Sequence, residues 1–352
     1  YAQLEAPLGK ALEASVGWRL QYDRGYGTAA KPKLGLKWRL GPGLSLRASW
    51  AAGRRVPTAI ELERPSLRSD PAFYTIVPAS ALPCRSPVAV DEQAAYCALR
   101  LDDTGNPKLR PETSHSLDLG LLWSPGREIG VTLDIYRIEI DHQISPIPLS
   151  YAIWNPGSYP QVFQRDAEGR LVALNSQLVN LGRTRLQAFS LDVRRGWDTE
   201  RRGHFLLNLG LDYLQHLDRQ VVPGGPALHY AGYASQPRLT ALAGLEWSYR
   251  DWNATANLRY TGNYRYRPYA GADGYLACPD DRRRAGHCDT PAFAILDLNL
   301  AYAGFAHWTV GFNVHNLLDH QPTYYGAPGY YYNPLFDDVA GRYFLLSFSW
   351  RR

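Results

Sequence analysis

The sequence predicts an all-β protein, a transmembrane antiparallel β-barrel whose strands run up and down. Three observations support this fold class: apolar and polar residues alternate along many segments, connections are alternately short and long, and tryptophans gather beside the short ones. Successive side chains of a strand point to opposite faces, so one face can meet lipid while the other lines a polar lumen. About thirteen such segments follow one another along the 352 residues.

Composition excludes a helical membrane protein and leaves a barrel open. Apolar residues make up 45% of the chain, but its mean hydropathy is −0.34. No apolar run approaches the roughly 18 residues that a membrane helix needs, whereas barrel strands expose only alternate residues to lipid and give a weak hydropathy signal. The formal charge of +5 is spread along the chain, so no nucleic-acid partner is expected.

The N-terminal strands are predicted at residues 1–5, 11–22, 32–40 and 44–50. From Leu12 to Tyr22 every second side chain is apolar, and the residues between them are polar or small. The same holds from Leu34 to Leu40 and, after Gly41-Pro42-Gly43, from Leu44 to Trp50. Period-two alternation on both sides of a Gly/Pro turn predicts a hairpin.

The remaining strands repeat this pattern at residues 117–123, 129–135, 189–197, 205–213, 239–247, 252–260, 296–302, 308–314 and 344–350. One change of phase occurs after Ile135, where the apolar residues move to Tyr136, Ile138 and Ile140. A β-bulge, or the exit of the strand from the lipid, would explain it.

The connections between predicted strands form two classes. Short ones lie near 6–10, 41–43, 125–127, 198–202, 250–251 and 304–307, and long ones near 23–31, 54–112, 145–180, 216–235, 268–291 and 317–341. In bacterial outer-membrane barrels the short turns are periplasmic and the long loops lie outside. We therefore expect a bacterial outer-membrane location, extracellular long connections and a periplasmic C-terminus.

Seven tryptophans lie beside the short connections or the C-terminus: Trp38, Trp123, Trp197, Trp247, Trp252, Trp308 and Trp350. Indole is amphipathic and prefers the membrane–water interface, so these residues predict a periplasmic aromatic girdle. In a soluble all-β domain tryptophans would cap the core, and nothing would gather them at one end. The girdle, the strand lengths and the asymmetry of the connections all favour the membrane barrel.

The four cysteines form two local pairs, Cys84–Cys97 and Cys278–Cys288. Four cysteines allow three connectivities, and the short separations favour two local disulfides formed in an oxidising compartment. The competing interpretation is a metal site of Cys278, His287 and Cys288. Adjacent His and Cys ligands lack the usual zinc spacing, so no metal site and no cofactor are predicted.

Five motifs in order resemble TonB-dependent receptors, and together they span nearly the whole chain: Arg55-Val56-Pro57-Thr58-Ala59-Ile60-Glu61-Leu62, Asn106-Pro107-Lys108-Leu109-Arg110-Pro111-Glu112-Thr113, Val179-Asn180-Leu181-Gly182-Arg183, Asn316-Leu317-Leu318-Asp319 and Gly341-Arg342-Tyr343-Phe344. The resemblance implies a 22-stranded barrel with a plugged lumen, of which residues 1–352 would be the C-terminal portion. The plug, the first strands and the TonB box would lie outside this chain. The family usually ends on its terminal aromatic, whereas Arg351-Arg352 follow Trp350 here.

No hydrolase, P-loop or dinucleotide motif is present, so the chain is not predicted to be an enzyme. Binding residues are expected in the long connections. The candidates are Arg54 and Arg55, which begin the longest connection, and Tyr324, Tyr325, Tyr330, Tyr331 and Tyr332. The tyrosines could stack on a flat ligand, or they could form an outer aromatic belt or pack the loop. Arg282-Arg283-Arg284 could meet lipopolysaccharide phosphates or be a solvated charge run.

The resulting hypothesis is an outer-membrane receptor that binds and imports a scarce solute, with a ferric siderophore as the favoured ligand. Expected partners are outer-membrane lipid and lipopolysaccharide, the TonB complex through an N-terminal region, and a small-molecule or metal-chelate ligand, with a monomeric barrel in the full-length protein. Three alternatives are a passive porin or diffusion channel, an outer-membrane enzyme and a soluble β-sandwich adhesin.

Overall fold

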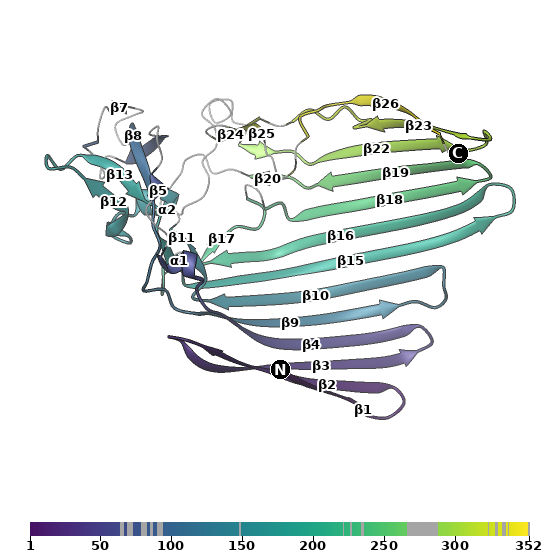
Figure 1. Cartoon of the computed structure of the whole chain (residues 1–352), viewed down its shortest axis with the longest axis horizontal. Coiled ribbons are helices and arrows are strands. Elements are labelled where there is room, and N and C mark those ends of the chain that lie inside the picture. The colour runs from purple at the N-terminus through teal and green to yellow at the C-terminus, as the bar shows by residue number, and fades with distance from the viewer. Residues whose placement is uncertain are drawn as a thin grey trace.

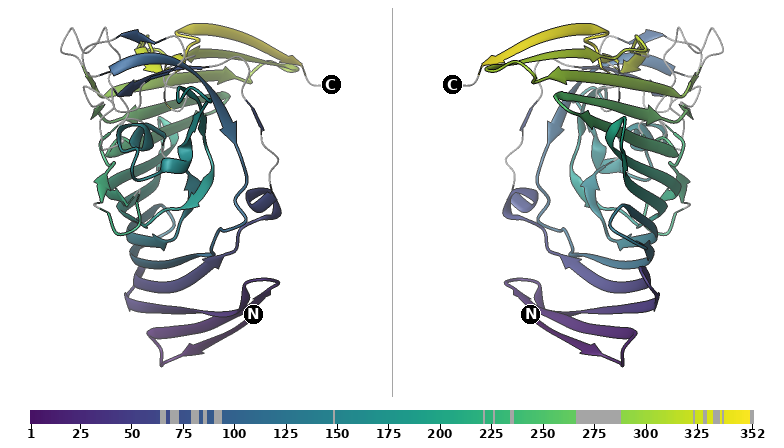
Figure 2. Two further views of the ribbon diagram at one scale, coloured as in Figure 1. Left: turned by 90° about the vertical axis from the view of Figure 1, so that its left-hand side faces the viewer. Right: turned by 90° about the vertical axis from the view of Figure 1, so that its right-hand side faces the viewer.

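The computed structural model is built around one large antiparallel sheet, shown from two directions in Figures 1 and 2. The structure describes residues 1–63, 67–68, 73–78, 83–84, 87–89, 94–147, 149–220, 222–225, 227–233, 236–265, 288–322, 324–327, 330–332, 336 and 338–350. Thirteen strands follow one another across the sheet in chain order, and the edge strands are the first and the last. The prediction of about thirteen up-and-down strands is confirmed.

The sheet strands are β1 (Ala2–Pro7), β2 (Leu12–Asp23), β3 (Gly27–Gly41), β4 (Leu44–Arg55), β9 (Glu112–Trp123), β10 (Ile129–Asp141), β15 (Arg183–Thr199), β16 (Gly203–Arg219), β18 (Leu239–Tyr249), β19 (Trp252–Thr261), β22 (Phe293–Tyr302), β23 (Trp308–His315) and β26 (Tyr343–Trp350). Short β17 (Leu228–His229) pairs with the end of β16. The sheet is curved and open in the described part of the chain, since β1 pairs only with β2 and β26 only with β23.

The outer face of the sheet carries the apolar residues that were predicted to face lipid. Side chains such as Leu36 on β3, Leu119 on β9 and Phe348 on β26 are 44%, 46% and 64% exposed. Registers such as Leu36↔Ala48 and Val310↔Phe348 keep these rows on one face from strand to strand. This continuous apolar face is the surface that meets lipid in a membrane barrel.

One connection between strands differs from the sequence-based expectation. Residues 23–31 were expected to be a long connection, but β2 and β3 stay paired up to Asp23↔Gly27. Gly25 and Gly27 have φ of 87° and 73°, which lets the chain reverse tightly. Residues 27–31 carry no apolar alternation, so the sequence pattern could not reveal this part of the strand.

The phase change after Ile135 does not reflect a bulge in β10. The register of β10 runs without a break to Asp141 on both sides, so Arg137 and Glu139 occupy the outer face. Arg137 pairs there with Glu139, which also lies 2.9 Å from Arg185 of β15. Of the two explanations offered for the phase change, a β-bulge or the exit of the strand from the lipid, the structure therefore agrees with the second. The extra residue lies in β16, where Gln215 is skipped between Leu214 and His216.

The long connections carry structure of their own at one end of the sheet. They contain α1 (Ala59–Glu63), β5 (Leu67–Arg68), β6 (Phe73–Pro78), β7 (Val88–Ala89), β8 (Ala94–Asp103), β11 (Ile144–Pro146), α2 (Leu149–Trp154), η2 (Pro160–Val162), β12 (Phe163–Arg165), β13 (Leu171–Asn175), β14 (Leu178–Asn180), β20 (Tyr264–Arg265), β21 (Asp289–Thr290), β24 (Tyr324–Ala327) and β25 (Tyr330–Tyr332). Neither described helix has the length or apolar character needed to cross a membrane.

Three of these connections build a small module with its own core, at the upper left of Figure 1. We call it the loop module; its core consists of Val77, Cys84, Cys97, Leu99, Ile147, Tyr151, Ala152, Ile153, Tyr159, Val162, Leu171, Leu174 and Leu228. Strands β8 and β13, from different connections, pair in parallel at its centre. Burial, with a smaller contribution from Tyr151, raises the pKa of the Tyr159 hydroxyl to about 12.

A disulfide joins Cys84 and Cys97 inside the loop module, with their Cα atoms 6.0 Å apart. Both cysteines are almost completely buried, so the disulfide is part of the core. This pairing was predicted from the sequence and is confirmed. For the second predicted pair, Cys278 lies outside the described residues.

Candidate functional site at the rim

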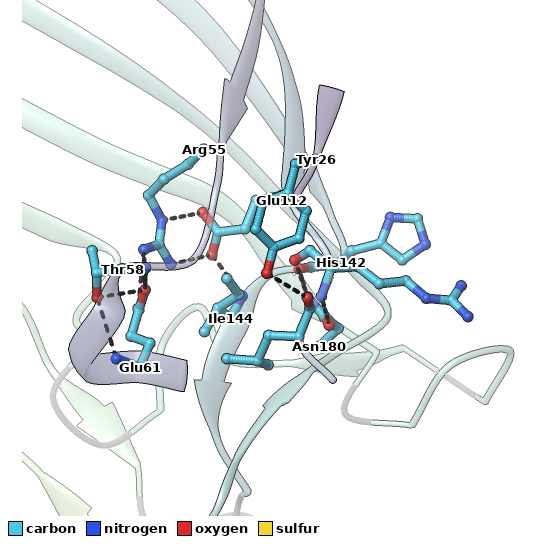
Figure 3. A network of polar contacts seen from close by, with 10 residues as sticks. Tyr26, Arg55, Thr58, Glu61, Glu112, His142, Ile144 and Asn180 are labelled. Carbon is cyan, nitrogen blue, oxygen red and sulfur yellow. Dashed lines mark hydrogen bonds and ion pairs between the residues drawn. The ribbon is translucent and has the colours of Figure 1, made fainter. Parts of the chain in front are cut away.

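The rim is the end of the sheet where the strands give way to the long connections. Arg55, the last residue of β4, lies at this end of the sheet and links several partners of a polar network (Figure 3). Its Nε and Nη2 donate to the two carboxylate oxygens of Glu112 at 2.8 and 3.0 Å, and Nη1 donates to Glu61 at 2.8 and 3.0 Å. Every guanidinium nitrogen is therefore used, in the bidentate geometry that suits a carboxylate.

Glu61 links this arginine to the start of α1. It accepts hydrogen bonds from the Thr58 backbone N–H at 2.7 Å and hydroxyl at 3.1 Å, while Thr58 Oγ1 accepts from Glu61 N–H at 3.3 Å. These reciprocal bonds are a capping box, which fixes where the helix begins. Burial alone would raise the pKa of the Glu61 carboxyl, but the hydrogen bonds from Arg55 and Thr58 together lower it below its ordinary value.

Glu112 and Asn180 join this arginine to the next long connection (Figure 3). Glu112 accepts from the Ile144 N–H at 2.6 Å, and Asn180 Nδ2 donates to the carbonyls of Arg110 and His142 at 2.9 and 2.7 Å. Asn180 Oδ1 in turn accepts from the Arg110 N–H at 2.8 Å. Three motifs far apart in sequence therefore meet in one network that ties the loop module to the sheet.

Arg54 lies beside this network and is also directed into the protein. Its guanidinium donates to the carbonyls of Tyr26 at 2.7 Å and Gly27 at 3.3 Å, and it lies 3.6 Å from Asp23. The sequence suggested ligand contacts for Arg54 and Arg55. Their described contacts are structural, and a ligand role for either residue stays a prediction.

The other two motifs form a second network at the C-terminal side of the rim. Asn316 is fully buried and has φ of 51°, a conformation that asparagine tolerates better than most residues. Its side chain donates to the His320 carbonyl at 2.8 Å and accepts from the His320 N–H at 3.0 Å. Arg342 donates to the Leu317 carbonyl and to Asp319, both at 3.3 Å, so the two ends of the last connection are held together.

His315 lies next to this turn and was missed by sequence reasoning, because its partners are distant in sequence. Its Nδ1 lies 2.9 Å from Asp297 of β22, and its Nε2 lies 2.6 Å from Asp338 in the last connection. Asp297 also lies 4.0 Å from Arg259 of β19. No spacing signal in the sequence marks this set of residues.

The inner face of the sheet is polar and internally paired. Arg47 of β4 pairs with Asp134 of β10 at 2.7 Å across Gly120 of β9, where a β-carbon would collide with both side chains. A hollow of about 750 Å³ lies on the same face over β10, β15, β16, β18 and β19, lined by groups that include Asp192, Arg194 and Glu246. Such a wall can hold water or a polar protein segment, which fits the lumen-facing role expected from sequence.

The predicted tyrosine cluster lies on a small hairpin, with Tyr324 opposite Tyr332 in β24 and β25. Only the backbone is described there, so ligand binding by Tyr324, Tyr325, Tyr330, Tyr331 and Tyr332 stays a prediction. Arg282-Arg283-Arg284 and Arg351-Arg352 lie outside the described residues. In the described part of the chain, no group of three or more His, Cys, Asp or Glu residues is arranged to hold a metal ion.

The seven tryptophans all lie at the opposite end of the sheet from the rim, close to the short connections. Trp308 and Trp350 are directly opposite each other on β23 and β26. Trp197 stacks on Phe205 with ring centroids 5.2 Å apart, and Trp252 packs against Tyr302 at 4.6 Å. Their position matches the expected ring, while their role as an interfacial girdle remains a prediction.

Comparisons with known proteins agree with this architecture. The family model described as TonB dependent receptor-like, beta-barrel matches residues 1–317. A variant of the ferric enterobactin receptor PfeA from Pseudomonas aeruginosa superposes with a TM-score of 0.63 at 18% identity, over 98% of this chain and 43% of that one. The siderophore receptor PirA from Acinetobacter baumannii gives 0.60 at 15% identity, over 99% and 44%.

The copper transporter OprC is also similar, with a TM-score of 0.55 at 15% identity, over 99% of this chain and 47% of that one. No curated protein matches the sequence. At these identities the structural likeness concerns the fold, and the chain spans less than half the length of each of these three proteins.

Proposed function

This chain belongs to the TonB-dependent receptor β-barrel family, and we propose that its protein is an outer-membrane receptor that imports a scarce solute with energy from the TonB complex. The observation that carries the proposal is the rim network. Arg55, Glu112 and Asn180 tie long connections to a sheet whose outer face is apolar and whose inner face is polar and ion-paired. A solute-binding surface held over a polar lumen is suited to a receptor that first binds the solute and then lets it pass through the barrel.

The favoured solute is a ferric siderophore. PfeA is named as a ferric enterobactin receptor, PirA as a siderophore receptor and OprC as a copper transporter, so each name refers to a metal or a siderophore. The tyrosines of 324–332 support this choice, because aromatic rings can stack on a flat chelate. Catalysis is not part of the proposal.

We infer that residues 1–352 form the C-terminal portion of the barrel domain, with the plug and TonB-contacting region elsewhere in the protein. The long connections would face outward, and the short connections and C-terminus would face the periplasm. The apolar outer face would contact lipid, the outer leaflet would supply lipopolysaccharide, and the tryptophans would lie at the periplasmic interface. The full-length barrel would be monomeric.

The test is solute uptake by the full-length protein in an outer-membrane receptor-deficient strain, with and without a functional TonB complex. Cells would be offered a panel of radiolabelled ferric siderophores and a copper chelate. Saturable uptake of one chelate that is lost without TonB supports the proposal. Uptake that grows linearly with solute concentration and does not need TonB would instead identify a passive diffusion channel. Saturable, TonB-dependent uptake of copper alone would replace the proposed solute.

A further inference from the structure

A single arginine interrupts the apolar outer face of the sheet. Arg195 of β15 lies on the same face as Val193 and Trp197, because alternate residues of a strand share a face. The register places it directly between Ile129 of β10 and Leu207 of β16. Arg195 is exposed, so this cation stands among side chains that face lipid in a membrane barrel.

The rest of this outer apolar band carries no charge. The band extends from the level of the tryptophans to the row of Ile135 and Phe189, above which Arg137 begins the polar part of the outer face. Across the thirteen strands of the described sheet, Arg195 is the only charged side chain at an outer-face position within the band. A charged side chain that faces hydrocarbon is costly, so Arg195 needs a compensating anion.

The described part of the protein supplies no such anion, since none of its carboxylates lies within ion-pair distance of the Arg195 guanidinium. Asp198 belongs to the inner face of β15 and lies 2.9 Å from His204. Glu128 contacts this part of β15 through its backbone carbonyl, which accepts from the Gly196 N–H at 2.7 Å. The guanidinium lies instead over the ring of Trp197, with Cζ 6.0 Å from the ring centroid.

Trp197 adds a second free donor beside the guanidinium. Its ring is held by stacking on Phe205 of β16, with centroids 5.2 Å apart and planes inclined by 5°. The Trp197 indole N–H has no acceptor among the described residues, whereas that of Trp247 donates to the Arg202 carbonyl at 2.6 Å. A planar guanidinium next to an indole N–H suits the oxygens of a phosphate group.

The height of Arg195 on the sheet indicates the source of that phosphate. Tryptophans prefer the membrane interface, and Arg195 lies one same-face step inward from Trp197, roughly 7 Å along the strand. An arginine can snorkel over such a distance, with its methylenes on the apolar surface and its charged end at the headgroups. A phospholipid reaches this position from within the bilayer, whereas a free phosphate ion would have to leave water beside an apolar surface.

We propose that Arg195 and Trp197 form a binding site for the phosphate of one phospholipid, in the leaflet at the tryptophan end of the barrel. The guanidinium and the indole N–H bind the phosphate oxygens, and the acyl chains lie along Ile129, Val193 and Leu207. The inference rests on the proposed function, which places the outer face of the sheet in lipid. Solute uptake and phospholipid binding are separate measurements, so either can fail while the other succeeds.

The experiment is native mass spectrometry of the full-length protein in detergent, titrated with phosphatidylglycerol. We expect the affinity of the tightest-bound phospholipid to fall about tenfold in Arg195→Gln, because the charge-assisted hydrogen bonds are lost. Arg195→Lys keeps the charge without the bidentate geometry, and Trp197→Phe keeps the ring without the N–H, so each should lose less. Arg194→Gln is the matched control and should bind like the parent, because Arg194 lines the hollow on the inner face.

Two competitors identify the bound group. A digalactosyl diacylglycerol, which has acyl chains but no phosphate, should not replace the phospholipid, and inorganic phosphate should not displace it. In liposomes, solid-state NMR should show a contact between guanidinium ¹⁵N and lipid ³¹P that Arg195→Gln lacks and Arg194→Gln keeps, which tests the site without a binding constant.

Several results would overturn the site. They are equal affinity of the parent and either Arg195→Gln or Trp197→Phe, weaker binding in Arg194→Gln, replacement by the galactolipid, and displacement by inorganic phosphate. Absence of the Arg195-dependent phosphorus contact in the parent would do the same, even if Arg195→Gln does not fold. Preference for lipopolysaccharide over phosphatidylglycerol would refute the choice of a phospholipid.

Discussion

Replacing Arg55 with alanine tests whether the rim network anchors the loop module. The substitution removes all four hydrogen bonds to Glu61 and Glu112 and leaves two carboxylates without their shared cation. Charge-assisted hydrogen bonds contribute about 1.5–3 kcal/mol each when buried. Arg55 is 42% exposed, however, and exposed pairs contribute only about 0–1 kcal/mol.

Taking about 1 kcal/mol for each carboxylate gives about 2 kcal/mol for opening of the module, which is roughly a 30-fold change in the opening equilibrium. Native-state proteolysis of the full-length protein in detergent measures this quantity, because cleavage follows the population of the open form when reclosing is fast. We expect cleavage within the long connections to accelerate about 30-fold, while resistance of the barrel to heating in SDS stays unchanged.

Arg39→Ala is the matched control, since Arg39 makes one exposed contact, to Glu13 at 3.4 Å, at the other end of the sheet. If Arg55→Ala and Arg39→Ala cleave at the same rate, the rim network does not anchor the module. If Arg55→Ala instead abolishes solute binding without faster cleavage, the ligand-binding role suggested by the sequence is the correct one.

Three further predictions concern the module, the sheet and pH. Replacing Cys84 and Cys97 by serine opens a loop with a sequence separation of 13 and should cost the loop module about 3 kcal/mol on the chain-entropy model, measured by the same proteolysis assay against the oxidised parent. Gly120→Val should force apart the ion pair that crosses it and lower the yield of folded, heat-modifiable barrel, at a cost of about 1–3 kcal/mol; Gly126→Ala, whose β-carbon meets nothing, should not. Because the folded pKa of Glu61 is lowered, its contribution is fully present above the ordinary value of 4.5 and is lost only as the pH falls through the lowered value. In the same proteolysis assay, cleavage of the parent should accelerate as the pH falls through the lowered pKa of Glu61, and Glu61→Gln should not show this acceleration. The same pH dependence of cleavage in parent and variant would contradict the role given to Glu61.

The strands could be predicted because the lipid-facing pattern is written locally. A row such as Phe344, Leu346, Phe348 needs only the strand period and an apolar solvent, so the pattern does not depend on distant contacts. The same logic failed at residues 27–31, which pair with β2 although they carry no apolar alternation of their own.

The loop module could not be predicted, since its core is assembled from distant segments. Leu99, Tyr151 and Leu228 meet in one cluster, yet each comes from a different connection. Part of the rim could be predicted from the sequence. Thr58 and Glu61 have capping-box spacing, and the motifs around Arg55, Glu112 and Asn180 can be recognised in the sequence. Their partners are set by the sheet register, so the resemblance marked the residues but not the contacts between them.

The shared core of the loop module has a consequence for engineering and for sequence divergence. Because β8 and β13 come from different connections and pair side by side, neither connection carries a self-sufficient hydrophobic interior. If one of them alone were exchanged with a connection of another receptor, its apolar side would be exposed in the new protein. The connections left behind would lose the residues that they pack against. These segments should therefore be exchangeable only as a set, and substitutions in one of them should be accompanied by compensating changes in the others.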